Sequence, residues 1–127
     1  RSDLPCSQLR CAGGDLKKAL THFEAIERIT KRRWLMARVI RAKYFSVALQ
    51  NEVPKKATAK DREYAGKLAW HDFFLQLESV AKSPDNLWPS RNLYNAVARA
   101  KAVRMLKHAD DYIFPPKGFV NPYEESE

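Results

Sequence analysis

The scarcity of glycine is the feature that most restricts the fold of this chain. It has four glycines in 127 residues, and two of them are adjacent, at Gly13 and Gly14. A β-rich protein of this length needs many tight turns, for which glycine supplies the backbone conformations. Long stretches without glycine favour long helices instead. We therefore expect an all-α protein, and at this length a single domain over residues 1–127.

Apolar residues recur at helical spacing from Asp15 onward, and no glycine or proline interrupts them before residue 50. Asp15 is a suitable N-cap. The pattern predicts one long helix over residues 15–50, with a bend allowed near Thr30. Its second half is apolar over a wide arc, which is typical of the central helix of a bundle.

A second helix has clear signals at both ends. Pro54 stops the first helix, because the residue before a proline is disfavoured in the helical conformation. Thr58 and Asp61 have the spacing of a capping box, which predicts that a helix starts there. Pro84 follows the end of this helix.

A third helix can start at Ser90 and run to about Asp110. The chain then continues as an apolar segment over residues 112–116, which two prolines keep out of the helical conformation. The expected fold is an up-down bundle of three long helices with short helical or extended C-terminal pieces, an N-terminal arm over 1–14 and a tail over 115–127. The predicted buried stripe of the third helix consists of Leu93, Ala96, Val97, Ala100, Val103 and Leu106.

The two cysteines, Cys6 and Cys11, leave two readings open. In an oxidising compartment they can close a small disulfide loop, which would constrain only the arm; otherwise they are two free thiols. The chain begins at Arg1 and not at methionine, and we take this as favouring a secreted protein whose leader has been removed.

Motifs for catalysis, cofactors or metals are missing from the sequence. There is no Gly-x-Ser-x-Gly, no His-Glu-x-x-His and no P-loop. The three histidines lie too far apart for a metal site, and no run of apolar residues reaches the length of a membrane span. We therefore expect no enzymatic activity, no cofactor and no metal.

The charge of the chain points to an anionic partner. Lys and Arg number 23 against 15 Asp and Glu, a formal charge of +8. Dense basic groups can form a binding track, although such groups are also common on solvated helix faces. Nothing resembles a helix-turn-helix or an aromatic RNA-binding motif, so a nucleic acid is not the expected partner. The candidate binding residues are Arg33, Arg38, Arg41, Arg99, Lys101 and Arg104.

Aromatic residues accompany these charges. Trp88 lies in a loop beside a proline, and Tyr112 and Phe114 lie just beyond a helix. These three are the candidates for an exposed apolar patch. Basic residues interleaved with aromatic ones suit a protein that binds at a membrane interface.

The layout of the chain resembles that of the abalone sperm lysin family. The chain starts Arg1-Ser2, and its second helix contains Arg62-Glu63-Tyr64 followed by the aromatic run at residues 70–75, with a spacing that departs from the family by about one residue. A proline-containing loop and a third helix with an aromatic tail complete the resemblance, over roughly residues 15–115. The two cysteines and the acidic end depart from lysin itself and favour its fusagenic branch.

The resemblance implies a lysin-like fold and a function that needs no catalysis. It implies a secreted protein of the sperm acrosomal vesicle that binds the egg surface and promotes fusion of the two membranes. The alternative is binding and dissolution of the egg vitelline envelope. The implied partners are the egg plasma membrane or an egg-coat glycoprotein, with a homodimer as a further expectation.

Overall fold

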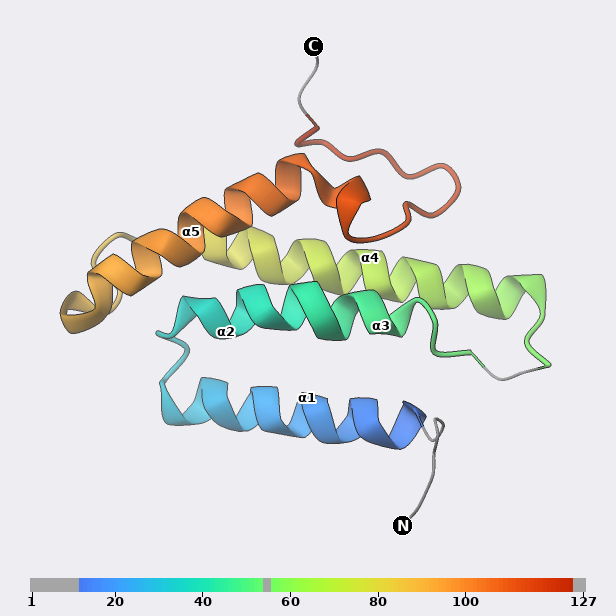
Figure 1. The fold of residues 1–127 in the computed structure, drawn as a ribbon, viewed down its shortest axis with the longest axis horizontal. Coiled ribbons are helices and arrows are strands. Elements are labelled where there is room, and N and C mark those ends of the chain that lie inside the picture. The colour runs from blue at the N-terminus through green and yellow to red at the C-terminus, as the bar shows by residue number, and fades with distance from the viewer. Residues whose placement is uncertain (1–11, 54–55, 125–127) are drawn as a thin grey trace.

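The computed structural model describes residues 12–53 and 56–124, and within these ranges the chain is all-α and contains no strand. Four helices pack together (Figure 1). Three of them are α1 (Ala12–Ile29), α4 (Ala59–Ala81) and α5 (Asn92–Lys107). The remaining one is a continuous rod made of α2 (Leu35–Ile40), the π-helical segment η1 (Arg41–Ser46) and α3 (Val47–Leu49). Two 3₁₀ turns, η2 (Pro89–Arg91) and η3 (Ala109–Asp111), flank α5.

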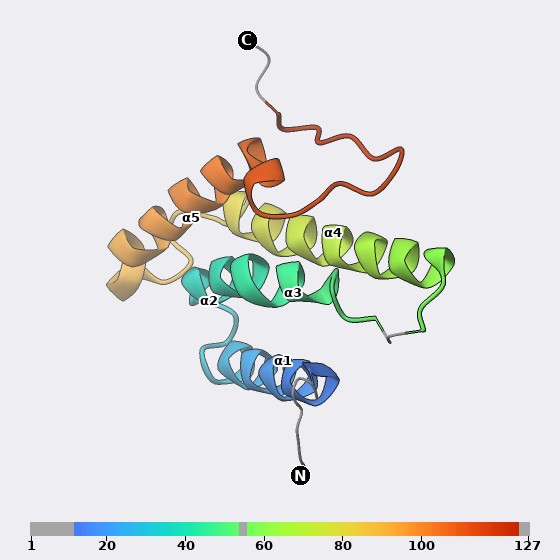
Figure 2. The same ribbon diagram turned by 45° about the vertical axis from the view of Figure 1, so that its right-hand side comes forward.

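The core lies where the α2–α3 rod, α4 and α5 meet. Figures 1 and 2 show α1 on one side of the rod, with α4 and α5 on the other. The largest fully buried apolar side chains are Leu35, Phe73, Leu77, Met105 and Ile113. The expected all-α class is therefore confirmed, whereas the expected bundle of three long helices is wrong. None of the helices in the described part of the chain is long and apolar enough to cross a membrane.

The chain reverses direction where one continuous helix was predicted. After Ile29 the backbone of Lys31 and Arg32 has positive φ values of 55° and 60°. The amide of Lys31 donates to the carbonyl of Arg28, and that of Arg32 donates to the carbonyl of Glu27. This pair of hydrogen bonds defines a Schellman motif, a common helix ending that usually has glycine at the left-handed position. The expected bend near Thr30 is thus a full break, at a residue that carried no glycine signal.

A residue distant in sequence starts the next helix. The side-chain oxygen of Asn95 accepts a hydrogen bond from the amide of Leu35 at 3.2 Å. Its amide nitrogen donates to the carbonyl of Arg33 at 2.9 Å. Asn95 is 1% exposed. It therefore caps α2 across the core, from a helix that lies sixty residues further along the chain.

The start of α4 follows the sequence prediction. Thr58 is the N-cap, its side chain accepts from the amide of Asp61, and the Asp61 carboxylate accepts from the amide of Thr58. Both halves of a capping box are therefore present. Such a motif forms within four consecutive residues, so it can be recognised without any tertiary information.

The π-helical segment brings two polar side chains onto one carboxylate. Arg41 makes two hydrogen bonds to Asp72, at 2.8 and 3.2 Å, and the hydroxyl of Ser46 donates to the same residue at 2.5 Å. Residues five apart in an α-helix differ by about 140° in direction. The i→i+5 hydrogen bonds of a π-helix bring them nearly into line. The segment thus positions Arg41 and Ser46 together against α4.

The buried face of α5 differs from the predicted one. The structure buries Asn95, Ala98, Ala102, Met105 and Leu106. Of the predicted stripe only Leu106 is buried, whereas Leu93 is 75% exposed and Val97 is 53% exposed. Apolar residues occur around most of this helix, so their spacing is compatible with more than one buried face. Small residues at Ala98 and Ala102 allow α4 and α5 to approach closely, which decides between the faces.

The segment after α5 folds back over α4 and α5. The side-chain amide of Asn121 donates to the backbone carbonyl of Leu106 at 2.8 Å, which satisfies one carbonyl at the end of α5. The ring of Tyr123 stacks on Phe74, and its hydroxyl donates to Glu78. That hydrogen bond, together with burial and the charge of Glu78, raises the pKa of Tyr123 above its ordinary value.

Candidate interaction surface at the α1–α2 turn

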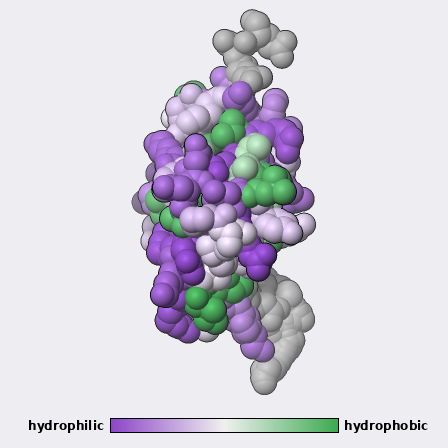
Figure 3. Space-filling view, turned by 90° about the vertical axis from the view of Figure 1, so that its left-hand side faces the viewer, coloured by the Kyte–Doolittle hydropathy of each residue, from purple (hydrophilic) through white to green (hydrophobic). Residues whose placement is uncertain are grey.

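Three segments that are distant in sequence meet at one end of the bundle. They are the α1–α2 turn, the loop between α4 and α5, and the start of α5 (Figure 1). Figure 3 looks at this end and shows a largely hydrophilic surface interrupted by separate hydrophobic patches. We call the basic and aromatic residues gathered here the arginine–tryptophan surface. Its members are Lys31, Arg32, Arg33, Trp88, Arg91 and Tyr94.

Cation–π contacts join four of the members of this surface, namely Arg33, Trp88, Arg91 and Tyr94. The guanidinium of Arg33 lies 4.7 Å from the centre of the Trp88 ring. That of Arg91 lies 6.0 Å from the same ring and 5.9 Å from the ring of Tyr94. Stacking restricts these long side chains while their edges stay available as hydrogen-bond donors. The contacts therefore preorganise a site for carboxylates or other planar anions.

The backbone at this surface is strained. A left-handed conformation costs a residue with a side chain on the order of 1 kcal/mol, and Lys31 and Arg32 adopt it in succession. Arg32 remains 67% exposed at its side chain although it pairs with Glu27 at 3.1 Å. Glycine would relieve the strain at Lys31. The turn instead presents basic side chains to solvent.

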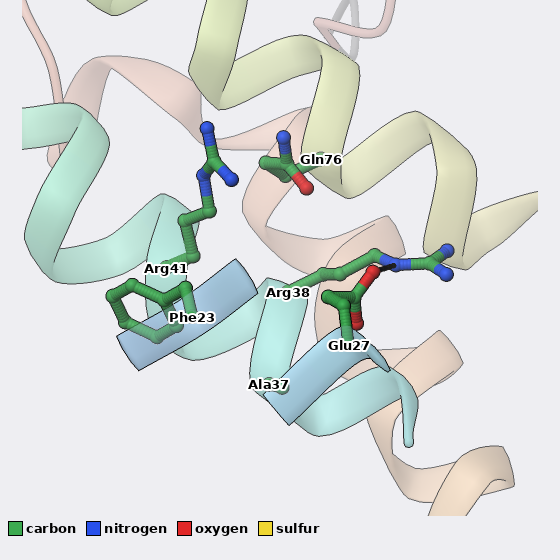
Figure 4. A pocket seen from close by; sticks show the side chains of 6 residues that line it. All are labelled: Phe23, Glu27, Ala37, Arg38, Arg41 and Gln76. Carbon is green, nitrogen blue, oxygen red and sulfur yellow. Dashed lines mark hydrogen bonds and ion pairs between the residues drawn. The ribbon is translucent and has the colours of Figure 1, made fainter. Parts of the chain in front are cut away.

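Arg38, one of the predicted binding residues, holds the fold together. Its side chain is 8% exposed, and it donates to the Glu27 carboxylate at 2.9 Å (Figure 4). It also donates to the hydroxyl of Ser79 and to the carbonyl of Arg32. These contacts tie α1, the turn and α4 to α2. The interpretation of Arg38 as a contact for an external partner does not fit this burial.

The cavity beside Arg38 is too small for a ligand. It has a volume of about 10 Å³, close to the minimum for one water molecule. Figure 4 shows that Phe23 and Glu27 from α1 face Arg38 and Arg41 from the rod and Gln76 from α4. No group of three or more potential metal ligands occurs among the described residues. This junction is therefore a packed and charged contact between helices.

The remaining basic candidates differ in their contacts within the protein and in their exposure to solvent. Arg41 is paired with Asp72 and its side chain is 20% exposed. Arg99 donates to the carbonyl of Pro84 at 3.1 Å and lies 3.6 Å from Asp85, so it fastens the α4–α5 loop. Lys101 is half-buried, whereas Arg104 is exposed. The structure brings neither Lys101 nor Arg104 to the arginine–tryptophan surface, because both lie further along α5.

The aromatic candidates lie in three different environments. Trp88 is half-buried beneath Arg33. Tyr112 is also half-buried, and its ring centre lies 6.2 Å from that of Phe73. The prediction that Tyr112 belongs to an exposed apolar patch is therefore wrong. Phe114 is 79% exposed and lines an open groove of about 370 Å³ between the end of α3, the first half of α4 and the tail. Cys6 and Cys11 lie outside the described residues.

Tyr94 belongs to the surface but was not predicted. It lies three residues after Arg91, and residues at this spacing share a helix face. The shared face of Arg91 and Tyr94 could therefore have been recognised from their spacing in the sequence. The contact of Arg91 with Trp88 from the preceding loop could not be recognised in the sequence, because it depends on how that loop folds back.

The comparisons with known proteins give one match. The family model described as TRAP transporter T-component matches residues 5–113, which include all four helices. No curated protein and no solved structure matches the chain.

This match corrects the expectations that came from the lysin resemblance. It contradicts the sperm lysin family, the role in fertilization, the egg-surface partners and the acrosomal location. The aromatic run behind that resemblance is explained by packing, since Trp70, Phe73 and Phe74 are buried in the core. The expected lack of enzymatic activity agrees with a family of transporter components. The chain belongs to the TRAP transporter T-component family.

Proposed function

We propose that this protein is an accessory, non-enzymatic component of a bacterial TRAP transport system that acts by binding other protein components of that system. The observation that carries the proposal is the family match over residues 5–113. A binding role is supported by the basic side chains that gather at one end of the described part of the chain, where Arg33 lies over the ring of Trp88. The partner supplies carboxylates to those basic side chains.

The arginine–tryptophan surface is the site that we assign to this contact. Arg, Trp and Tyr are the residue types that contribute most to binding energy at protein interfaces. Arg33 and Arg91 are held against Trp88 before any partner arrives, which lowers the entropy lost on binding. The strained turn at Lys31 and Arg32 fits the same role, since strain of this kind persists mainly at functional sites.

The binding experiment uses the full chain and the other purified components of the same transport system. Arg91→Glu should weaken binding about tenfold or more, because Arg91 is exposed and its reversal places a carboxylate against the carboxylates of the partner. Arg33→Lys keeps the charge but loses the planar stacking, and should weaken binding by a smaller factor. Arg62→Glu is the matched control, an exposed arginine on α4 that is not part of this surface.

Two results would contradict the proposal. Failure of the wild-type chain to bind any other component would remove the proposed function. Equal losses for Arg91→Glu and Arg62→Glu would show that net charge matters and that the surface does not.

The proposal includes a periplasmic location. The periplasm is oxidising, so Cys6 and Cys11 would form a disulfide there. Fractionation of cells should place the protein with periplasmic markers, and a thiol-reactive probe should label the cysteines only after reduction. Cytoplasmic fractionation with freely reactive thiols would overturn this part.

A further inference from the structure

We infer that the outer face of α5 is a docking strip for an amphipathic helix that carries carboxylates and belongs to another component of the transporter. This inference rests on the proposed function and adds a second contact surface to it. The strip consists of Leu93, Ala96, Val97, Ala100, Val103 and Arg104.

The strip is apolar although it is exposed. Leu93 is 75% exposed, Val97 53% and Val103 40%, and Ala96 and Ala100 are exposed as well. At 100° per residue, Leu93, Ala96, Val97, Ala100 and Arg104 share an arc of about 100°. Ala102, which is buried in the core, lies on the opposite side of the helix from Leu93. The apolar pattern of α5 that predicts a buried face therefore has no partner within the described part of the chain.

The shape of the strip suits a helix. Ala96 and Ala100 are four residues apart and form a shallow row between the larger side chains of Leu93, Val97 and Val103. Ridges of side chains on one helix pack into such rows on another, and small residues in the row allow the axes to come close. An extended peptide would need free backbone groups to pair with, which a helix surface does not offer.

The charge of α5 defines the chemistry of the partner. The helix has four basic residues, Arg99, Lys101, Arg104 and Lys107, and no acidic residue. Arg104 lies within the strip, is exposed, and forms no ion pair among the described residues, whereas Arg99 is held by the α4–α5 loop. A helix with glutamate or aspartate beside its own apolar stripe would match this arrangement.

The same charges argue against a second copy of the chain as the occupant. Two α5 helices in contact would surround the contact with basic side chains and would bring no carboxylate from either helix. Like charges placed together at an interface destabilise it. The partner is therefore a different, acidic helix.

The first experiment measures binding of the full chain to the other purified components of the transport system. The double variant Leu93→Ser/Val97→Ser should weaken binding about tenfold or more, because it removes most of the apolar area that the partner helix covers. Its melting temperature should match that of the wild type, since both residues are exposed. Val120→Ser is the matched control, because Val120 is 79% exposed but lies in the tail, and it should bind within about twofold of the wild type.

The second experiment uses a synthetic probe and does not depend on the transporter. The probe is a helical peptide with leucine and alanine on one face and glutamate on both sides of that face. It should bind the wild-type chain and Val120→Ser but not Leu93→Ser/Val97→Ser. A peptide with lysine in place of glutamate should not bind, and Arg104→Glu should weaken binding of the glutamate peptide several-fold.

The outcomes separate the two hypotheses. If the glutamate peptide binds in this pattern but no transporter component does, the proposed function fails and the docking strip stands. If components and peptide bind Leu93→Ser/Val97→Ser as well as the wild type, the strip is refuted while the proposed function stands. Self-association of the chain that this double variant abolishes, or binding of anionic vesicles that it abolishes, would also overturn the inference, because a second copy or a membrane would then occupy the face.

Discussion

Helices α4 and α5 both carry apolar residues at helical spacing, but the two helices use these residues in opposite ways. In α4 the apolar residues Ala65, Ala69, Phe73, Leu77 and Val80 are buried, as their spacing predicts. In α5 most of the evenly spaced apolar residues face solvent, and the buried face consists of Asn95, Ala98, Ala102, Met105 and Leu106. Helical spacing identifies an apolar face, but it does not tell whether the same chain or another one covers that face.

The largest effect should come from the core of α4. Phe73→Ala removes a fully buried ring that contacts Phe74 and Tyr112, and should lower the free energy of unfolding by about 3–5 kcal/mol. Leu75→Ala, on the 51% exposed side of the same helix, should change it by less than about 0.5 kcal/mol. Denaturant unfolding of both variants measures the difference. Similar losses would mean that α4 is covered on both faces.

The buried asparagine of α5 should have the next largest effect. Asn95→Ala removes both hydrogen bonds to the start of α2 and leaves a buried amide and carbonyl without partners, at a cost of about 2–4 kcal/mol. In Asn95→Ala, backbone hydrogen exchange should accelerate more in α2 than in α4, relative to the wild type. An unchanged stability would show that α2 does not need the cap from α5.

Two alanines of α5 distinguish its faces directly. Ala102→Leu forces a larger side chain into a packed contact and should destabilise the protein by about 1–3 kcal/mol. Ala100→Leu, on the exposed side two residues away, should have an effect of less than about 0.5 kcal/mol. Thermal melts of this pair measure the comparison. The reverse order of effects would restore the face that the sequence pattern predicted.

The smallest effect concerns the tail that packs beside both helices. In the folded protein the pKa of Tyr123 is raised above 10.0 by its hydrogen bond to Glu78, by burial and by the charge of Glu78. The folded state therefore holds this proton more tightly than the unfolded chain does. The resulting stabilisation is fully present below pH 10 and is lost as the pH rises through the raised pKa.

A pH titration checks this expectation. Tyrosinate absorbance should show one tyrosine that ionises later than the others, and Tyr123→Phe should remove that step. The stability of Tyr123→Phe should depend less on pH in this alkaline range than that of the wild type. An identical dependence would show that the tail contact is not coupled to ionisation.

Local signals explain which parts of the fold could be predicted. The capping box at Thr58 and Asp61 and the proline at Pro84 act within a few residues, and the bounds of α4 follow from them. The break after Ile29 had no such signal, because Lys31 occupies a position that glycine usually takes. The break is held by Arg38 and Asn95, which reach it through space.

The candidate surface was predictable in composition and not in arrangement. Arg33 and Trp88 were both identified from sequence, but their contact depends on a turn and a loop that meet only in the folded chain. Arg38 and Arg41 looked equally available for a partner and instead form ion pairs with Glu27 and Asp72. Charge density does not distinguish these two fates, because the acidic partners lie on other helices.

The sequence by itself determined the all-α class, the start and end of α4, and the excess of basic charge. These properties depend on composition, on caps and on the periodicity of consecutive residues. Only the tertiary structure decided where the first helix breaks, which arginines are neutralised and which face of α5 is buried. Each of these depends on residues from different helices meeting in space, and the free energy of such contacts is not contained in any local segment.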